Sequence, residues 1–160
     1  MTSYCTTIPS PLGELVAVSN GRELTGLYTP AHRTRPATHG LPLRTALFDE
    51  LARQLALYFA GGLTAFEVPL SLHGTAFQGR VWSALRRIPY GVTVTYSELA
   101  RDIDAASAAR AVGAANAKNP ISIIVPCHRV IASDGSLRGY AGGLSRKRWL
   151  VAHERHAGSA

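Results

Sequence analysis

Hydrophobic and polar residues alternate in part near the start of the chain, and this pattern predicts β-strands. The two clearest strands are Leu12–Val18 and "ELTGLYT" at residues 23–29, and Asn20-Gly21 between them is a strong signal for a hairpin turn. "SYCTTI" at residues 3–8 is a candidate third strand. The pattern therefore predicts a small three-stranded antiparallel sheet.

A helical pattern begins after residues 30–42, which we expect to form a loop because prolines and a glycine interrupt them. Apolar residues then recur with the spacing of one helix face until Gly61-Gly62 ends the pattern. The residues that carry this stripe are Leu43, Ala46, Leu47, Leu51, Leu55, Tyr58 and Phe59. We expect this helix to pack against the sheet.

The second half of the chain predicts mainly helices. Residues 75–88 place apolar side chains on one face and arginines on the other, and Pro89-Tyr90-Gly91 ends that helix. The apolar run Ile121–Val125 predicts a buried strand. A last helix is expected over residues 145–153, and its spacing aligns Lys147, Leu150, Val151 and Glu154 on one face.

Two short helices are expected between these elements. Thr95-Tyr96-Ser97-Glu98 fits a capping box that starts the first helix. The second covers Ala106–Asn116, and Asn119-Pro120 terminates it. Two short helices joined by a tight turn are typical of a DNA-binding helix-turn-helix, although such pairs also occur as plain packing units.

Together these elements predict an α/β (α+β) fold in two domains. We expect residues 1–74 to form a small N-terminal domain, with the three-stranded antiparallel sheet and its helix. Residues 75–160 should form a mostly helical C-terminal domain. A chain of 160 residues is long enough for two small units that share an interface.

The net charge of +7 is concentrated in the predicted C-terminal domain. Lysines and arginines balance acids in residues 1–74, so the whole excess lies in residues 75–160. Such a one-sided basic surface is typical of a protein that binds a polyanion such as DNA. A basic surface that serves only solubility is the alternative.

The composition also bears on location. No apolar run approaches the roughly 20 residues that a membrane span needs, and "MTSYCTTIPSPLG" lacks the profile of a signal peptide. We therefore expect a cytoplasmic protein with no membrane partner. Its two cysteines, Cys5 and Cys127, should then be free thiols, with Cys5 serving only for packing.

Cys127 stands in "IVPCHRV", between a proline and a His-Arg pair. A reactive cysteine needs a proton acceptor, and His128 is adjacent in sequence. Neighbouring side chains of an extended backbone point to opposite faces, so we expect a water to bridge the thiol and the imidazole. Glu154 is the candidate carboxylate for orienting His128, and the alternative is an exposed glutamate at the end of a helix.

The segment "PCHRVIASDGSLRGYAGGLSRKRWLVAHE" closely resembles the active-site region of the O6-alkylguanine-DNA alkyltransferases. The resemblance continues upstream through "FQGRVWSALRRIPYGVTVTYSELA" and "ARAVGAANAKNP", so it covers nearly all of residues 75–154. In residues 1–74 it is looser and limited to "SPLG" and "LYFAG". It implies a ribonuclease-H-like N-terminal domain and direct reversal of O6-alkylguanine damage, with O4-alkylthymine as a further substrate.

The resemblance implies roles for five catalytic positions. Cys127 would accept the alkyl group, and His128 and Glu154 would generate its thiolate through a water. Tyr96 would donate toward N3 of the leaving guanine. Asn119 would hold the turn before the active-site segment. Because a thioether does not hydrolyse, each molecule should act once, without a cofactor.

Five further positions are implied in binding. Arg110 would enter the duplex where the damaged nucleotide has flipped out, Tyr140 would wall the base pocket, and Lys147 would lie near its mouth. Backbone groups of Val130 and Ala141 would read the base. The helix at 106–116 is rich in alanine and glycine, which suits sequence-tolerant contact with the minor groove of double-stranded DNA. We expect a monomer, with cooperative binding to DNA left open.

Other functions remain alternatives at this point. A cysteine hydrolase would also use Cys127, His128 and Glu154, but it would turn over many times. A non-catalytic damage-recognition or regulatory protein would bind DNA without alkyl transfer, and the presence of Cys127 argues against it. No metal is expected, because His153 and His156 have no cysteine ligands near them in sequence.

Overall fold

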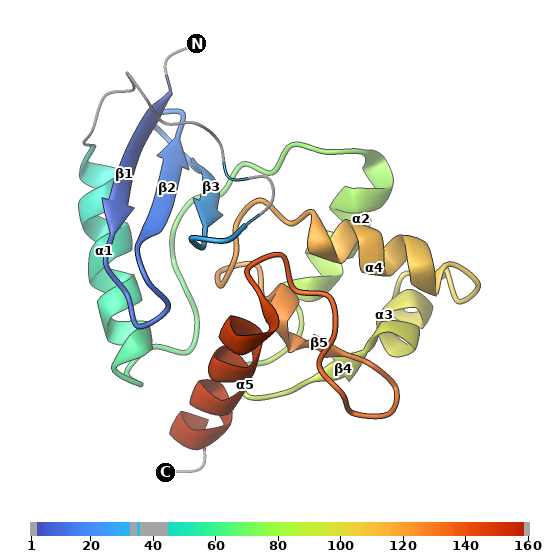
Figure 1. Ribbon diagram of the computed structural model, residues 1–160. Coiled ribbons are helices and arrows are strands. Elements are labelled where there is room, and N and C mark those ends of the chain that lie inside the picture. Colours follow the sequence, from blue (N-terminus) through green and yellow to red (C-terminus); the bar gives the residue numbers. More distant parts are fainter. Residues whose placement is uncertain (1–2, 33–34, 36–44, 159–160) are drawn as a thin grey trace.

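The computed structural model describes residues 3–32, 35 and 45–158. Its N-terminal part holds a three-stranded antiparallel sheet in the order β1-β2-β3, formed by β1 (Tyr4–Ile8), β2 (Leu15–Ser19) and β3 (Leu24–Tyr28). Helix α1 (Ala46–Phe59) lies along this sheet (Figure 1). The predicted sheet and helix are therefore confirmed, although Leu43 and most of the predicted loop at 30–42 lie outside the described residues.

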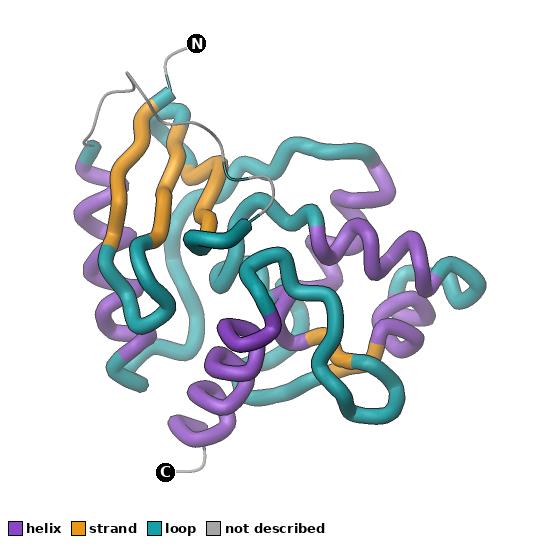
Figure 2. Tube along the Cα trace, in the orientation of Figure 1, coloured by secondary structure: helices purple, strands orange, loops and turns teal. Residues whose placement is uncertain are grey.

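Helices dominate the rest of the chain (Figure 2). They are α2 (Ala76–Leu85), α3 (Tyr96–Asp102), α4 (Ala109–Ala117), the single-turn helix η1 (Cys127–Arg129) and α5 (Leu144–Gly158). A short parallel pair, β4 (Val94–Thr95) and β5 (Val130–Ile131), joins them and was not predicted. Capping boxes start α2 at Thr75 and α3 at Thr95, so the predicted capping box at Thr95 is confirmed. Helices α3 and α4 pack against each other and against α2, as a helix-turn-helix requires.

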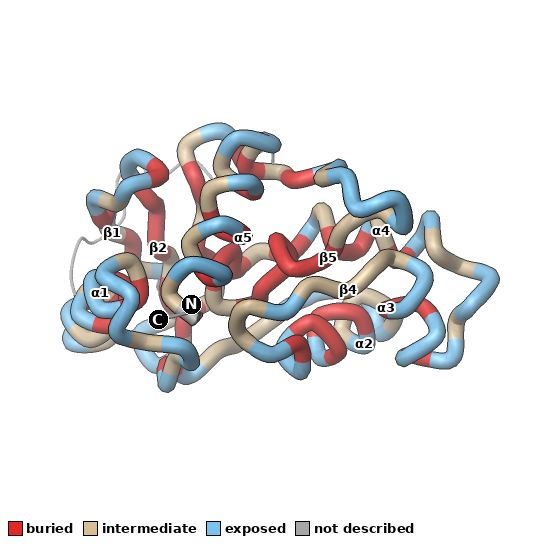
Figure 3. The backbone as a smooth tube through the Cα atoms, turned by 90° about the horizontal axis from the view of Figure 1, so that it is seen from below, coloured by how far each residue is buried: buried red, intermediate tan, exposed pale blue. Residues whose placement is uncertain are grey.

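One continuous hydrophobic core joins the two halves of the chain. It includes Leu15 and Leu51 from the N-terminal part and Val81, Leu99 and Val125 from the helical part. Buried segments accordingly run through the middle of the molecule when it is seen from below (Figure 3). The overall α/β fold is confirmed, while the domain boundary at residues 74 and 75 stays a prediction.

The segment before Cys127 differs from the prediction. Ile121–Val125 is buried apart from half-buried Ile124, but it is a series of turns and not a strand. Local hydrogen bonds close these turns, from Val125 N–H to the Ile121 carbonyl at 3.1 Å and from Ile124 N–H to the Ser122 carbonyl at 2.8 Å. Ile123 adopts a positive φ of 74°, which an extended strand does not allow. The apolar run correctly indicated burial, but burial alone does not determine the backbone conformation.

Backbone hydrogen bonds connect this turn segment to the edge of the sheet. Leu27 of β3 donates its N–H to the Pro120 carbonyl at 2.8 Å, and the Leu27 carbonyl accepts from Ser122 N–H at 3.0 Å. Helix boundaries also differ slightly from the predictions, since α4 begins at Ala109 and α5 continues past His153. Because α5 is longer than expected, Glu154 lies inside the helix and not at its end.

Candidate active site around Cys127

Cys127 begins η1 and is buried, with only 5% of its surface exposed. The prediction of an extended backbone between Cys127 and His128 was wrong, because η1 is a single turn of 3₁₀-helix. Burial raises the pKa of the Cys127 thiol, while the Asn119 side chain, the charge of Lys147 and backbone N–H groups act to lower it. The sulfur is therefore a thiol at rest and needs a base before it can react.

His128 is fully buried and contacts Glu154, with 2.8 Å between Nε2 and Oε2. Burial lowers the pKa of His128, against the opposing effect of Glu154, so the imidazole is neutral. A neutral imidazole beside an ionised carboxylate carries its proton on the nitrogen that faces the carboxylate. The other nitrogen, Nδ1, then holds a free lone pair, and it has no hydrogen-bond partner among the described residues. Nδ1 is thus the basic atom of the site.

Glu154 is buried in α5 and accepts hydrogen bonds from three side chains. Arg129 donates from Nε to Oε1 at 2.8 Å and from Nη2 to Oε2 at 3.0 Å. Tyr58 donates its hydroxyl to Oε2 at 2.6 Å. Burial acts to raise the pKa of Glu154, but the hydrogen bonds and charges of His128 and Arg129 outweigh it and lower the pKa. The carboxylate is therefore ionised, and the alternative of an exposed glutamate is excluded.

Asn119 lies at the centre of the turns before Cys127. Its Nδ2 donates to the Val125 carbonyl at 2.8 Å and to the Ile121 carbonyl at 3.3 Å, while its Oδ1 accepts from Ile121 N–H at 3.0 Å. Asn116 of α4 donates to the Cys127 carbonyl at 3.3 Å. These amides satisfy buried carbonyl groups that no strand partner reaches.

Tyr96 and Lys147 share a hydrogen-bond acceptor, and the charge of Cys127 acts on both. The Tyr96 hydroxyl donates to the Arg138 carbonyl at 2.9 Å, and Lys147 Nζ donates to the same carbonyl at 2.7 Å. Burial lowers the pKa of Lys147 to about 8, against the attraction of the Cys127 thiolate. Burial, followed by the charge of Cys127, raises the pKa of Tyr96. Tyr96 is consequently a proton donor whenever the site is at neutral pH.

The residues predicted to line the base pocket lie near this group. Val130 is fully buried, Tyr140 is 9% exposed, and Ala141 is half-buried in the loop before α5. The Tyr140 hydroxyl is buried and has no partner within the described part of the chain. Gly142 follows, and a Cβ there would collide with the Thr29 side chain, so this loop needs glycine to approach the sheet.

Arg110 lies apart from the buried group, on the exposed first turn of α4. The same helix approaches Tyr96, because a Cβ on Gly113 would lie 3.8 Å from the Tyr96 ring. One face of α4 is therefore next to the candidate site, while Arg110 extends from the helix surface. The structure does not bring Arg110 into contact with Cys127.

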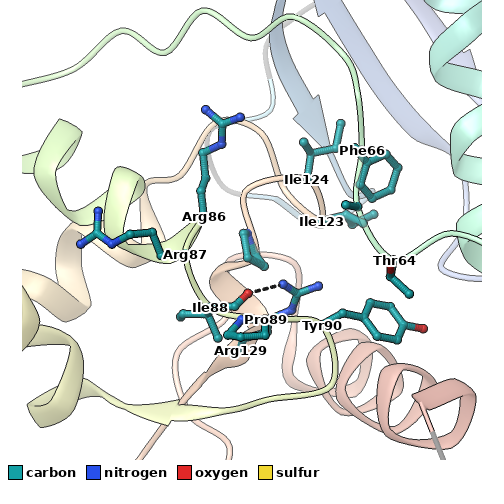
Figure 4. A pocket seen from close by; sticks show the side chains of 12 residues that line it. Thr64, Phe66, Arg86, Arg87, Ile88, Pro89, Tyr90, Ile123, Ile124 and Arg129 are labelled. Atoms are coloured by element: carbon teal, nitrogen blue, oxygen red, sulfur yellow. Dashed lines mark hydrogen bonds between the residues drawn. The ribbon is translucent and has the colours of Figure 1, made fainter.

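A cavity of about 230 Å³ opens behind Arg129 (Figure 4). Its lining includes Phe66, Arg86, Tyr90 and Ile124, and the Arg129 guanidinium within it donates to the Ile88 carbonyl at 2.7 Å. Cys127, His128 and Tyr96 do not line it. This cavity is separate from the thiol, and Arg129, which donates to Glu154, forms part of its lining.

Sequence reasoning missed two of the residues around Glu154. Arg129 follows His128 directly, but it was counted as part of a basic surface, whereas it is only 8% exposed. Tyr58 was assigned to the apolar stripe of α1, and nothing in its spacing indicates a polar partner 96 positions away. Among residues 3–32, 35 and 45–158, no cluster of histidine, cysteine and acidic side chains could hold a metal ion. Within the same residues, no helix is long and apolar enough to span a membrane.

A buried thiol near a neutral imidazole, with an ionised carboxylate behind it, is the arrangement of a cysteine-dependent group-transfer protein. Comparison with known proteins assigns the family. Residues 76–156 match the DNA binding domain of 6-O-methylguanine DNA methyltransferase, and residues 3–72 match its ribonuclease-like domain. The chain belongs to the 6-O-methylguanine DNA methyltransferase family.

Individual relatives agree with this assignment. A methylated-DNA–protein-cysteine methyltransferase from Mycobacterium leprae is 48% identical over 153 residues, which cover 96% of this chain and 93% of the relative. The protein of the same name from Mycobacterium tuberculosis H37Rv is 52% identical over 150 residues, covering 93% of this chain and 90% of the relative. A crystal structure of Mycobacterium tuberculosis OGT in complex with DNA matches with a TM-score of 0.90 at 47% identity, over 96% of this chain and 94% of that one.

Proposed function

We propose that Cys127 is the residue that takes the alkyl group from O6-alkylguanine in DNA, and that each molecule does so once. The family repairs DNA by alkyl transfer to a cysteine, and this chain has only Cys5 and Cys127. The observation that carries the assignment is the buried His128–Glu154 pair directly beside Cys127. Cys5 lies in β1, where it pairs across the sheet with Val18.

The thiol is activated by His128. A water between Sγ and Nδ1 would carry the thiol proton to the free lone pair of the imidazole. Glu154 would stabilise the imidazolium that forms, as a carboxylate does in other triads, and Arg129 keeps that carboxylate ionised. The raised pKa of Cys127 supports this order of events, because the resting thiol does not ionise without the base.

Alkyl transfer is then an in-line displacement at a saturated carbon. The sulfur lone pair forms the S–C bond, the C–O6 bond breaks, and its electron pair passes into the guanine ring. Tyr96 would donate a proton toward guanine N3, and the proton held by His128 restores the balance, so no proton is gained or lost overall. The product is a thioether, which has no hydrolysable bond, and the thiol is not regenerated.

Tyr96 must change partner for this step. Its hydroxyl donates to the Arg138 carbonyl in the structure, and Lys147 Nζ lies 3.5 Å from the same hydroxyl. Lys147 can keep its own bond to the Arg138 carbonyl when Tyr96 turns toward guanine. Asn119 would meanwhile keep the turns before Cys127 in place through its bonds to Val125 and Ile121.

The damaged base must leave the duplex to reach a buried sulfur. We assign the binding of double-stranded DNA to α3 and α4, with the alanine-rich α4 in the minor groove and Arg110 filling the space of the flipped nucleotide. Val130, Tyr140 and Ala141 would line the pocket that receives the base. A pocket that reads an O6-alkyl group would also admit O4-alkylthymine, whose alkyl oxygen occupies a similar position.

We propose that the protein works as a monomer in the cytoplasm, where reducing conditions preserve the thiol. No cofactor takes part in the steps above. Two alternatives make different predictions. A cysteine hydrolase would regenerate its thiol, and a non-catalytic recognition protein would bind the lesion and leave it unchanged.

The proposal is tested with two cysteine variants and a duplex oligonucleotide that contains one O6-methylguanine. Cys127→Ser should abolish loss of the lesion and keep its affinity for DNA, because only the nucleophile is removed. Cys5→Ser is the matched control and should repair the lesion at the rate of the unaltered protein. Repair by Cys127→Ser, or loss of repair in Cys5→Ser alone, would overturn the assignment.

A further inference from the structure

Tyr58 provides a direct connection between the N-terminal sheet unit and the candidate active site. It lies in α1, is fully buried, and donates its hydroxyl to Glu154 Oε2 at 2.6 Å. The two residues are 96 positions apart in sequence. Glu154 lies in α5, and this helix contacts the C-terminal end of α1 through His153 and Glu154 (Figure 1). The hydroxyl thus crosses the interface between the two halves of the chain.

The Tyr58 ring is held in place independently of its hydroxyl. It makes edge contacts with Phe59 and Tyr90 and a tilted contact with Phe66, with ring centroids 5.2 to 6.2 Å apart. The Tyr58 carbonyl lies 2.8 Å from His153 Nε2, on the same helix as Glu154. A change from tyrosine to phenylalanine therefore removes one hydrogen bond and leaves the surrounding packing intact.

The hydrogen bond from Tyr58 affects the chemistry of the site because of the oxygen that accepts it. Oε2 is the same oxygen that accepts the Nε2 proton of His128. Burial, then the charge of Glu154, raises the pKa of Tyr58, so the phenol stays protonated and always donates. A second strong donor draws charge away from this oxygen and weakens its attraction for the imidazole proton.

We propose that Tyr58 is a positioning residue that sets the basicity of His128 by sharing Glu154 Oε2 with it. This inference rests on the proposed function of His128 as the base for Cys127. Without the hydroxyl, the carboxylate would stabilise the imidazolium more strongly, and the pKa of His128 would rise. The fraction of neutral base at a given pH would fall, so the rising limb of the pH–rate profile moves to higher pH. The Glu154 carboxylate would also lose one of the hydrogen bonds that fix its orientation.

The test uses Tyr58→Phe with Tyr90→Phe as its matched control, because the buried Tyr90 hydroxyl has no partner among the described residues. Single-turnover alkyl transfer from O6-methylguanine DNA is measured from pH 5 to pH 9. Tyr58→Phe should raise the limb by about half a pH unit, which slows transfer by about threefold at pH values below the limb and has less effect above it. Its affinity for DNA should not change, and Tyr90→Phe should match the unaltered protein.

A second substitution removes any ambiguity from misfolding. Site-specific 3-fluorotyrosine at position 58 keeps the shape of the ring and makes the hydroxyl a stronger donor, so the limb should move to lower pH. A purely structural role predicts no such opposite shift. Unchanged pH profiles for both proteins would overturn the inference.

Peptide mass analysis of the unaltered protein distinguishes this failure from failure of the proposed function. An alkyl group found on Cys127, with unchanged profiles in the variants, would reject only the role of Tyr58. An unmodified Cys127 after loss of the lesion would reject the proposed function itself.

Discussion

Arg129 and Glu154 form a buried, two-point ion pair, with Nε 2.8 Å from Oε1 and Nη2 3.0 Å from Oε2. The parallel donors of arginine match the two oxygens of a carboxylate, which fixes the orientation of the carboxylate as well as its charge. Arg129 is the last residue of η1, which begins at Cys127, and Glu154 comes from α5. The ion pair therefore connects η1, which carries the thiol, to α5, the last helix of the chain.

Removal of Arg129 should be costly, because it leaves the charge of Glu154 buried with only neutral donors. We expect Arg129→Ala to lower the free energy of unfolding by about 3–5 kcal/mol. Urea unfolding at neutral pH measures this change. Arg53→Ala is the control, since Arg53 pairs with Glu50 in an exposed setting and should have little effect. Equal losses in the two variants would contradict the role of the buried pair.

Because the pKa of Glu154 is lowered in the folded protein, the free energy of unfolding should decrease at acidic pH. Its pKa in the fold lies below the ordinary value of 4.5, so the unfolded chain binds a proton first as the pH falls. The stabilisation from Glu154 is complete above pH 4.5 and is lost as the pH falls toward the pKa in the folded protein. Glu154→Gln should be less stable at pH 7, and the difference should narrow below pH 4.5. Urea unfolding at several pH values checks this, and a constant difference would contradict it.

Lys147 should make Cys127 more reactive, because its positive charge lowers the pKa of the thiol. We expect Lys147→Met, in a Cys5→Ser background, to react with iodoacetamide roughly threefold to tenfold more slowly at pH 7. Arg148→Met, which changes an exposed neighbour on α5, is the control. The difference should shrink above pH 8, where Lys147 loses its own charge. A difference that grows with pH would count against this mechanism.

Arg110 should matter only when a base has to leave a duplex. Arg110→Ala should slow repair of a duplex lesion roughly tenfold, which is the cost of losing a group that occupies the vacated space. Reaction with the free modified base should be unaffected. Arg22→Ala, an exposed change in the turn between β2 and β3, is the control for a general loss of charge. Similar losses on both substrates would show that Arg110 acts elsewhere.

Much of the fold follows from local patterns. The alternation around Asn20-Gly21 predicted the hairpin because its side chains face a core on one side of the sheet. Helical spacing placed Lys147 and Glu154 on one face of α5, and the structure shows that both side chains on this face are buried. Where the backbone is set by long-range bonds, the prediction failed. Ile121–Val125 is held in turns by the Asn119 side chain and by Leu27 of β3, and its composition does not encode those partners.

Two of the basic residues expected on the DNA-binding surface are buried. Arg129 and Lys147 were counted in the basic surface of residues 75–160, but both are buried. Their charges face Glu154 and Cys127 and are not available to DNA. The surface that faces DNA is therefore less basic than the net charge of +7 suggests. Only packing reveals this, since a sequence does not distinguish an exposed arginine from one paired inside the core.

The most direct test of the account is the mass of the protein after reaction with increasing amounts of damaged DNA, up to an excess of lesion over protein. A duplex with one O6-methylguanine per strand is titrated into the protein, and intact and peptide masses are recorded. We predict a gain equal to one methylene per molecule, located on the peptide that contains Cys127, and a loss of lesion that stops at one equivalent. Loss of more than one lesion per molecule, or an unmodified Cys127 peptide after the lesion has disappeared, would contradict the account.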